Sequence, residues 1–235
     1  MRWIISTRLS RLAWPFARRR NIADIGADDR SVAKAGGFDM TWIDQIVEVT
    51  GWRGEPVEYG WDREEAELGV RLPSDFKELT RRFPAGAFYA YLNLMRQEGE
   101  PDSHHLLVWH RSSLSVASDP QHQPDRLHEP YGLFQPGGRA GLIRWGMDQR
   151  EGEYYWLADR EVDPDSWPVL ARTEALAEEW ERFDMTASEV VYRVIADPEF
   201  KPLTVVDPPR RPFYLPAGQD LSVEGDALTA PDRDT

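Results

Sequence analysis

The chain has 235 residues, a formal net charge of -13 and 29% charged residues. Cysteine is absent, which excludes disulfides, thiolate nucleophiles and thiolate metal sites and favours a reducing, cytoplasmic location. No run approaches the ~20 apolar residues that would cross a bilayer, so we expect a water-soluble protein without a membrane span.

The basic residues are concentrated at the start, where residues 1–20 contain six arginines and no acidic residue. Residues 21–235 therefore carry 22 basic against 41 acidic side chains. An acidic surface repels phosphate backbones, because nucleic-acid binding depends on cationic groups that displace condensed counterions. The charge thus argues against nucleic acid as a ligand and favours a basic protein partner.

Residues 1–39 form a basic N-terminal extension that we expect to be disordered or to belong to an upstream start. Its three consecutive arginines at 18–20 precede NIADIGADD, which does not suit a secretory signal. The alternative is a functional arm that contacts anionic lipid or a partner.

The folded part is predicted to begin at Met40, where apolar residues recur at steps of three and four until Gly51, as in an amphipathic helix. A second helix is predicted over WDREEAELG at 61–69. Gly69 supplies the left-handed closing conformation that other residues resist.

A third helix is predicted almost at once in LPSDFKELTRRF at 72–83. Pro73 lies at or before its first turn, and Ser74 is expected to cap the free amides. So short a joint, pinned by Leu72, places the two helices at a sharp angle. We interpret the joint as architectural.

The middle of the chain is predicted from weaker patterns. AFYAYLNLM at 87–95 indicates one central strand, whereas LLVWHRSSLSVAS at 106–118 fits strand or helix, with helix preferred. Residues 119–140 contain four prolines and three glycines and are expected to form an irregular loop. Its buried anchor would be Tyr131, Leu133 and Phe134.

The next segment indicates a β-hairpin, with GLIRWG at 141–146 and EYYWLA at 153–158 as its strands. DPDSWPVLAR at 163–172 adds a turn and another strand, with Trp167 packed at the bend.

A last helix is predicted over TASEVVYRVIADP, opened by a capping box of Thr186 and Glu189 and blocked by Pro198. We therefore place a single domain at 40–198, followed by a proline-rich acidic tail at 199–235. In this tail Phe213, Tyr214 and Leu215 are expected to dock, and residues 216–235 to be mobile.

Catalytic signatures are missing from the sequence. G-x-S-x-G, the Walker A loop and H-E-x-x-H do not occur, and GGRAG at 137–141 precedes a predicted strand, whereas anion capture needs a helix terminus. The histidines carry no motif that fixes their geometry, so we expect solvated loop residues, no cofactor and no enzyme. The metal-site candidates are His104, His105 and His110, or His122 and His128 with Asp125 and Glu129.

The order of motifs resembles the SUKH superfamily, the group of bacterial immunity proteins and Smi/Knr-type fungal cell-wall-assembly regulators. The motifs are E-x-x-LG-x-x-LP-x-DF at 65–76, PYGLF, GGRAGLIRWG, YYWL, DPDSWPV and the closing WERFDMTASEVVYRVI. The resemblance covers about residues 41–197. Its distinctive positions are Glu65, Leu68, Gly69, Leu72, Pro73, Asp75, Phe76, Trp145 and Gly146.

The resemblance implies an α+β fold with a mainly antiparallel sheet flanked by helices, a helix near 106–118, and no catalytic residues. Many bacterial members are thought to bind and neutralise polymorphic toxins, often nucleases, while other relatives act as interaction modules. The basic extension, the histidine-containing loop at 104–128 and the proline-rich tail depart from the family pattern.

Charge and resemblance together favour an immunity protein that covers the cationic groove of a toxin domain. The alternatives are a regulatory protein-interaction module and, less favoured, a metal-dependent enzyme that uses the histidine loop. The carboxylates expected at the partner contact are Glu98, Glu100, Asp102, Glu151, Glu153 and Glu161.

Overall fold

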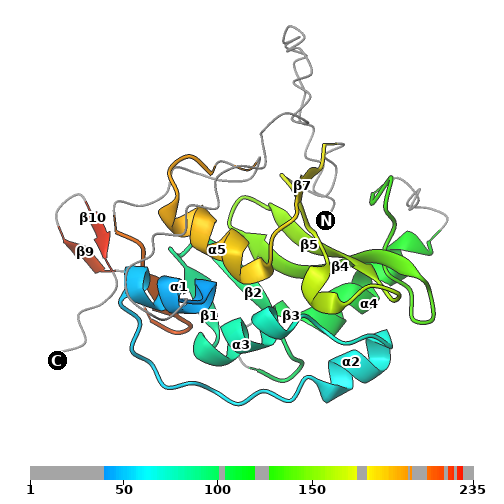
Figure 1. Ribbon diagram of the computed structural model, residues 1–235, viewed down its shortest axis with the longest axis horizontal. Helices are drawn as coiled ribbons and strands as arrows, with labels where there is room; N and C mark the ends of the chain where they lie inside the picture. Colours follow the sequence, from blue (N-terminus) through cyan, green and yellow to red (C-terminus); the bar gives the residue numbers. More distant parts are fainter. Residues whose placement is uncertain are drawn as a thin grey trace, which may run out of the picture. The chain divides into compact units, whose positions relative to one another are not determined.

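The computed structural model describes most of the chain from residue 40 onward (Figure 1). All described residues fall within the unit Asp39–Thr235, so the predictions for residues 1–39 lie outside the described residues. The described ranges are 40–100, 104–119, 127–173, 179–200, 202, 211–219, 222–224 and 227–229.

An antiparallel sheet forms the centre of the fold, with strands in the order β7-β6-β5-β4-β2-β1-β8. The short strand β3 pairs parallel to β2 beside this path, and β9 pairs with β10 in a separate hairpin. The strands are β1 (Gly86–Phe88), β2 (Leu92–Arg96), β3 (His104–His105), β4 (Ala140–Asp148), β5 (Glu153–Asp159), β6 (Val169–Arg172), β7 (Glu181–Phe183), β8 (Tyr214–Pro216), β9 (Ser222–Glu224) and β10 (Ala227–Thr229).

Helices flank this sheet, as the predicted α+β class requires. In Figure 1, α1, α3 and α5 lie side by side and pack on one another, while α4 packs on β4. No helix in the described ranges has the length and apolar composition needed to span a membrane. The helices are α1 (Trp42–Thr50), α2 (Asp62–Leu68), α3 (Ser74–Arg82), α4 (Leu106–Ala117), α5 (Ala187–Ala196) and the 3₁₀ helix η3 (Pro164–Ser166).

Both faces of the central strands are buried, as the alternation along β5 shows. Tyr154 and Trp156 enter the main core, which α1, α3 and α5 also line. Tyr155, between them, enters a second cluster with Leu142 and Leu170. The predicted hairpin of β4 and β5 is confirmed, and both of its strands are covered on two sides because successive side chains point to opposite faces.

The helix ends predicted from glycine are confirmed. Gly51 closes α1 at φ 63° and Gly69 closes α2 at φ 71°, both in the left-handed region that side chains with a Cβ rarely adopt. The helix preferred over a strand at 106–118 is also present, as α4.

One strand prediction is wrong. AFYAYLNLM forms two strands, because β1 ends at Phe88 and β2 begins at Leu92. The turn between them holds Tyr89 at φ 55° and Ala90 at φ 49°, a conformation uncommon for residues other than glycine. The aromatic and aliphatic residues of this segment favour a continuous strand and do not indicate the turn.

Two predicted helix caps differ from the structure. Ser74 does not accept from α3; its backbone N and Oγ donate to the Asp165 carboxylate, at 2.5 and 2.8 Å. At α5 the Thr186 half of the capping box is confirmed, since Thr186 Oγ1 accepts from Glu189 N at 3.2 Å. The Glu189 carboxylate accepts from Arg193 Nε, at 3.0 Å.

The tail contributes to the sheet beyond the predicted domain end. Phe213 and Tyr214 are buried, as predicted, and β8 pairs with β1 so that Tyr214 lies opposite Phe88. Within residues 216–235, which we expected to be mobile, β9 pairs with β10.

The Thr186 cap gives a stability prediction. Thr186→Ala should lower the free energy of unfolding by about 1 kcal/mol, because it removes an acceptor for the first turn of α5. Urea unfolding measures this change, with Glu48→Ala on the exposed face of α1 as a control. An unchanged midpoint in Thr186→Ala would contradict the role of the cap.

Candidate functional site

The joint between α2 and α3 is closed by a carboxylate. Glu65 Oε1 accepts from the backbone N of Leu72 at 2.9 Å and from Lys77 Nζ at 2.8 Å. These bonds tie the end of α2 to the start of α3 across Gly69. The motif residues Leu68, Leu72, Pro73 and Phe76 are buried at this corner.

The other motif residues are also structural. The Asp75 carboxylate, in the first turn of α3, accepts from Ser188 N at 3.0 Å and so caps α5. Trp145 is fully buried, and Gly146 stands at a register shift of β4 where the β2 backbone approaches. The prediction that the joint is architectural agrees with these contacts.

The six predicted contact carboxylates do not form one surface. Glu98 and Glu100 follow β2 at the sheet end where β5 reaches Asp159, and Glu161 lies just beyond that strand. Glu151 is exposed in the β4–β5 turn at the opposite end. Asp102 lies outside the described residues.

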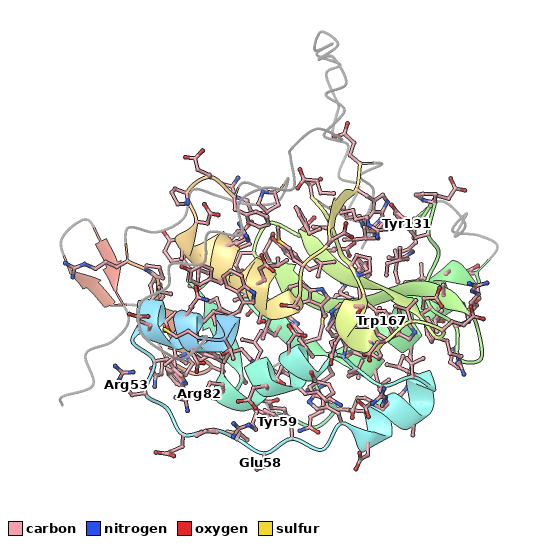
Figure 2. All side chains as sticks on the ribbon, viewed as in Figure 1. Arg53, Glu58, Tyr59, Arg82, Tyr131 and Trp167 are labelled. Atoms are coloured by element: carbon pink, nitrogen blue, oxygen red, sulfur yellow. The ribbon has the colours of Figure 1, made fainter. Side chains whose placement is uncertain are left out.

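Two of these carboxylates are already engaged near the first end. Glu98 pairs with Arg63 at 2.9 Å and with Arg111 at 3.0 Å. Glu100 accepts from the hydroxyl of Tyr59, at 2.7 Å. Burial and this bond raise the Tyr59 pKa, and Figure 2 shows Tyr59 on the loop that precedes α2. These two carboxylates thus help to hold the fold.

Glu153 is a wrong prediction, because only 6% of it is exposed. Its carboxylate accepts from Arg172 Nε at 2.6 Å, forms an ion pair with Arg144, and lies 3.0 Å from the Tyr155 hydroxyl. A buried charge is costly unless it is paired in this way.

The alternation of the strands could have indicated this cluster. Glu153 and Tyr155 lie on one face of β5, with Arg172 directly opposite Glu153 and Arg144 opposite Tyr155. Three charged residues thus align across three strands that are apolar on both faces. Sequence analysis missed both arginines.

Aromatic rings enclose the two guanidinium groups. Arg144 lies over Trp109 of α4 at 4.9 Å from the ring centroid, and Arg172 lies over Trp180 at 4.6 Å. Tyr131, labelled in Figure 2, contacts Trp180 edge-on. The cluster is therefore a packed cation–π layer on the second face of the sheet.

The histidines are not arranged for metal binding in the described ranges. There, no group of three histidine, aspartate or glutamate side chains could hold an ion. Burial lowers the pKa of His128 to about 4, and the positive charges of Arg172 and Arg144 add to this effect. Burial also lowers the pKa of His104 and of His110. The Nε2 of His110 lies 2.9 Å from the Phe134 carbonyl oxygen. His122 and Asp125 lie outside the described residues.

Three exposed acidic residues lie close together on the turn between β5 and β6, namely Glu161, Asp163 and Asp165. We call residues 159–165, DREVDPD, the acidic turn; it carries four carboxylates and one arginine. Glu161 is 66% exposed at its side chain, and Asp163 is exposed. The density of acidic residues in this short stretch could have indicated an acidic surface from the sequence, although sequence analysis selected only Glu161.

The acidic turn is held in place at both ends. Asp159 O accepts from Trp167 Nε1 at 3.0 Å, and Asp165 binds Ser74 at the start of α3. Trp167, labelled in Figure 2, is buried at the base of the turn. Between the turn and the helical corner lies a hollow of about 400 Å³ lined by Gly69, Val70, Arg71, Arg160, Glu161, Val162, Asp163, Pro164 and Trp167.

The Glu65 bond at the joint gives a second stability prediction. Glu65→Ala should lower the free energy of unfolding by about 1–3 kcal/mol, because it leaves the buried amide of Leu72 without its acceptor. Glu67→Ala, two residues along, should change little, since its ion pair with Arg111 is exposed. Equal urea midpoints for the two variants would argue against this role of Glu65.

The environment of His128 predicts a loss of stability in acid. Its folded pKa of about 4 lies below the ordinary 6.5, so the unfolded chain binds the proton more tightly. This contribution is complete above pH 6.5 and should fall by about 2 kcal/mol on going to pH 5. Urea unfolding from pH 7 to 5 should show a smaller loss for His128→Gln than for the parent chain or His105→Gln. If the free energy of unfolding falls equally with pH in all three chains, the role of His128 is contradicted.

Comparisons with known proteins add no assignment to this geometry. No family model, curated protein or solved structure matches the chain. The placement of its charged side chains therefore carries the functional proposal.

Proposed function

We propose that this chain is a non-catalytic protein-binding domain of the SUKH type that neutralises a basic partner, such as a nuclease toxin domain, by occlusion. The motif resemblance and the formal charge of -13 support this proposal. The observation that carries it is the acidic turn, which presents exposed carboxylates on a fixed backbone.

The acidic turn is suited to binding because little of it must be ordered on contact. Asp159 Oδ1 accepts from Glu161 N at 2.9 Å, and Asp163 Oδ1 accepts from Asp165 N at 3.1 Å. These bonds fix the turn internally, and Trp167 anchors its base. A pre-organised surface loses less conformational entropy when it binds.

The charges of the turn remain available to a partner. Glu161 pairs with Arg139 at 2.9 Å, but both side chains are mostly exposed, so a partner's lysine or arginine can replace this contact at little cost. A nuclease must present cationic groups to phosphate. Carboxylates facing that groove would steer association and block the substrate.

The hollow beside the turn offers a place for one partner side chain. Glu161 and Asp163 line it together with Val162, which is 43% exposed. Arg71 and Arg160 also line the hollow, so its charge is mixed, and a long basic side chain of the partner would use the side formed by Glu161, Val162 and Asp163.

The test is co-production with the product of the adjacent gene. If that product is toxic, the chain should restore growth and form a stable complex with it. The double variant Glu161→Lys and Asp163→Lys should weaken binding at least ~10-fold, mainly through slower association at low salt. Surface plasmon resonance at two salt concentrations measures both effects.

The matched control is Glu48→Lys with Glu55→Lys, which changes the net charge equally at exposed sites on α1 and the following loop. This control should retain most of the affinity. Toxicity that persists despite tight co-production would refute immunity against that product. Equal loss in both double variants would show that net charge, and not the acidic turn, determines binding.

A further inference from the structure

The outer face of α4 is unusually apolar for this chain. Val108, Trp109 and Val116 are 45%, 36% and 39% exposed, and the other large exposed hydrophobic side chains of the described ranges are scattered elsewhere. Ser112 and Ser115 are exposed between them. At 100° per residue these five positions cover a continuous arc of about 120°, which we call the α4 strip.

The strip is firmly held from below. Leu106, Leu107 and His110 are buried on the opposite side of α4. Trp109 rests on the guanidinium of Arg144, and its ring also contacts His104 edge-on at 6.3 Å. An exposed tryptophan fixed in this way is typical of the residues that dominate binding interfaces.

The charge of α4 argues against the basic partner proposed above. Its sequence, LLVWHRSSLSVA, contains no carboxylate and one arginine. Arg111 lies at the edge of the strip, where its Nε donates to Glu67 at 2.6 Å and its Nη1 to Glu98 at 3.0 Å. A cationic surface would find no complementary charge on the strip itself.

We propose that the α4 strip is the contact surface between two copies of this chain. A neutral strip is where two chains with a charge of -13 can approach with least repulsion. In a two-fold pair each strip covers its equivalent, and the small Ser112 and Ser115 let the helix axes approach to ~8–10 Å.

The border of the strip is complementary to itself. Arg63 is 60% exposed and Arg111 42% at their side chains, whereas Glu67 is 37% and Glu98 30% exposed. Two-fold symmetry brings equivalent borders together, so arginines of one copy can meet carboxylates of the other. The contact has an apolar centre and a mixed-sign rim, the usual anatomy of a protein interface.

The size of the strip sets the strength of the contact. Twelve residues of α-helix span about 18 Å, which places the interface at the small end of specific contacts. We therefore expect a reversible dimer with a dissociation constant on the order of 10 µM. Salt should strengthen it, because the exposed ion pairs at the rim contribute little, whereas screening reduces the repulsion between two acidic chains.

Sedimentation velocity of the full chain tests the proposal directly. From about 1 to 200 µM the weight-average mass should rise from the monomer value of 27.1 kDa towards twice that value. Val116→Glu should raise the dissociation constant at least ~10-fold by placing a charge in the strip. Val57→Glu, at a valine 38% exposed on a loop, is the matched control and should dimerise normally.

Two outcomes would overturn the proposal. The parent chain could stay monomeric at 200 µM, or Val116→Glu and Val57→Glu could weaken dimerisation equally. If Val116→Glu does not fold by circular dichroism, Ser112→Arg, at an exposed serine, takes its place. The variants of the acidic turn should still dimerise, so failure of dimerisation and failure of toxin binding can be told apart.

Discussion

The placement of α3 against the sheet is the constraint on which the rest of the structure depends. The ring centroid of Phe76, in the first turn of α3, lies 4.8 Å from that of Trp156 and 5.6 Å from that of Trp61. One ring thus joins the helical corner to β5. The ends of α3 are fixed as well. Asp165 binds its N-terminus, and the buried Arg96 donates to carbonyl groups at its C-terminal end. The acidic turn and the corner are thereby held in one rigid arrangement.

Many carboxylates are part of this framework and are buried or bound within the fold. Glu64, Asp148 and Glu153 are buried, and Asp75 and Glu65 bind backbone amides at helix ends. Because anionic groups stabilise helix N-termini and free amides, part of the acidic composition serves folding. A formal charge of -13 therefore overstates the negative charge that is available to a partner. The exposed carboxylates have to be located individually.

The sequence was sufficient where the structure depends on local signals. The helix ends at Gly51 and Gly69 and the hairpin of β4 and β5 follow from glycine conformation and apolar patterning. It was insufficient where partners are distant along the chain. The Asp165 carboxylate accepts from Ser74 at the start of α3, 91 positions away in the chain. Glu153 is neutralised by arginines on two other strands. The contact of Asp165 with Ser74 leaves no periodic trace, whereas the alternation of β5 places Glu153 and Tyr155 on one face without identifying the arginines opposite them.

The candidate surfaces were predictable to different degrees for the same reason. Glu161 could be chosen because acidic residues cluster in its turn, but its exposure depends on the packing of Trp167 beneath. The α4 strip could not be chosen at all. The pattern of its segment fits strand or helix, and even with helix preferred the direction of each side chain follows only when α4 docks on β4.

Carboxylates also explain why the outer face of α4 stays apolar. An arginine stem can cover neighbouring hydrophobic side chains, but Glu67 of α2 and Glu98 beyond β2 hold Arg111 at the edge of the helix. Val108 and Val116 thus remain uncovered. The two proposed surfaces then differ in physics, since salt weakens attraction at the acidic turn and relieves repulsion between copies at α4. Ionic strength would shift the balance between them, so one small domain can support both contacts without sharing residues.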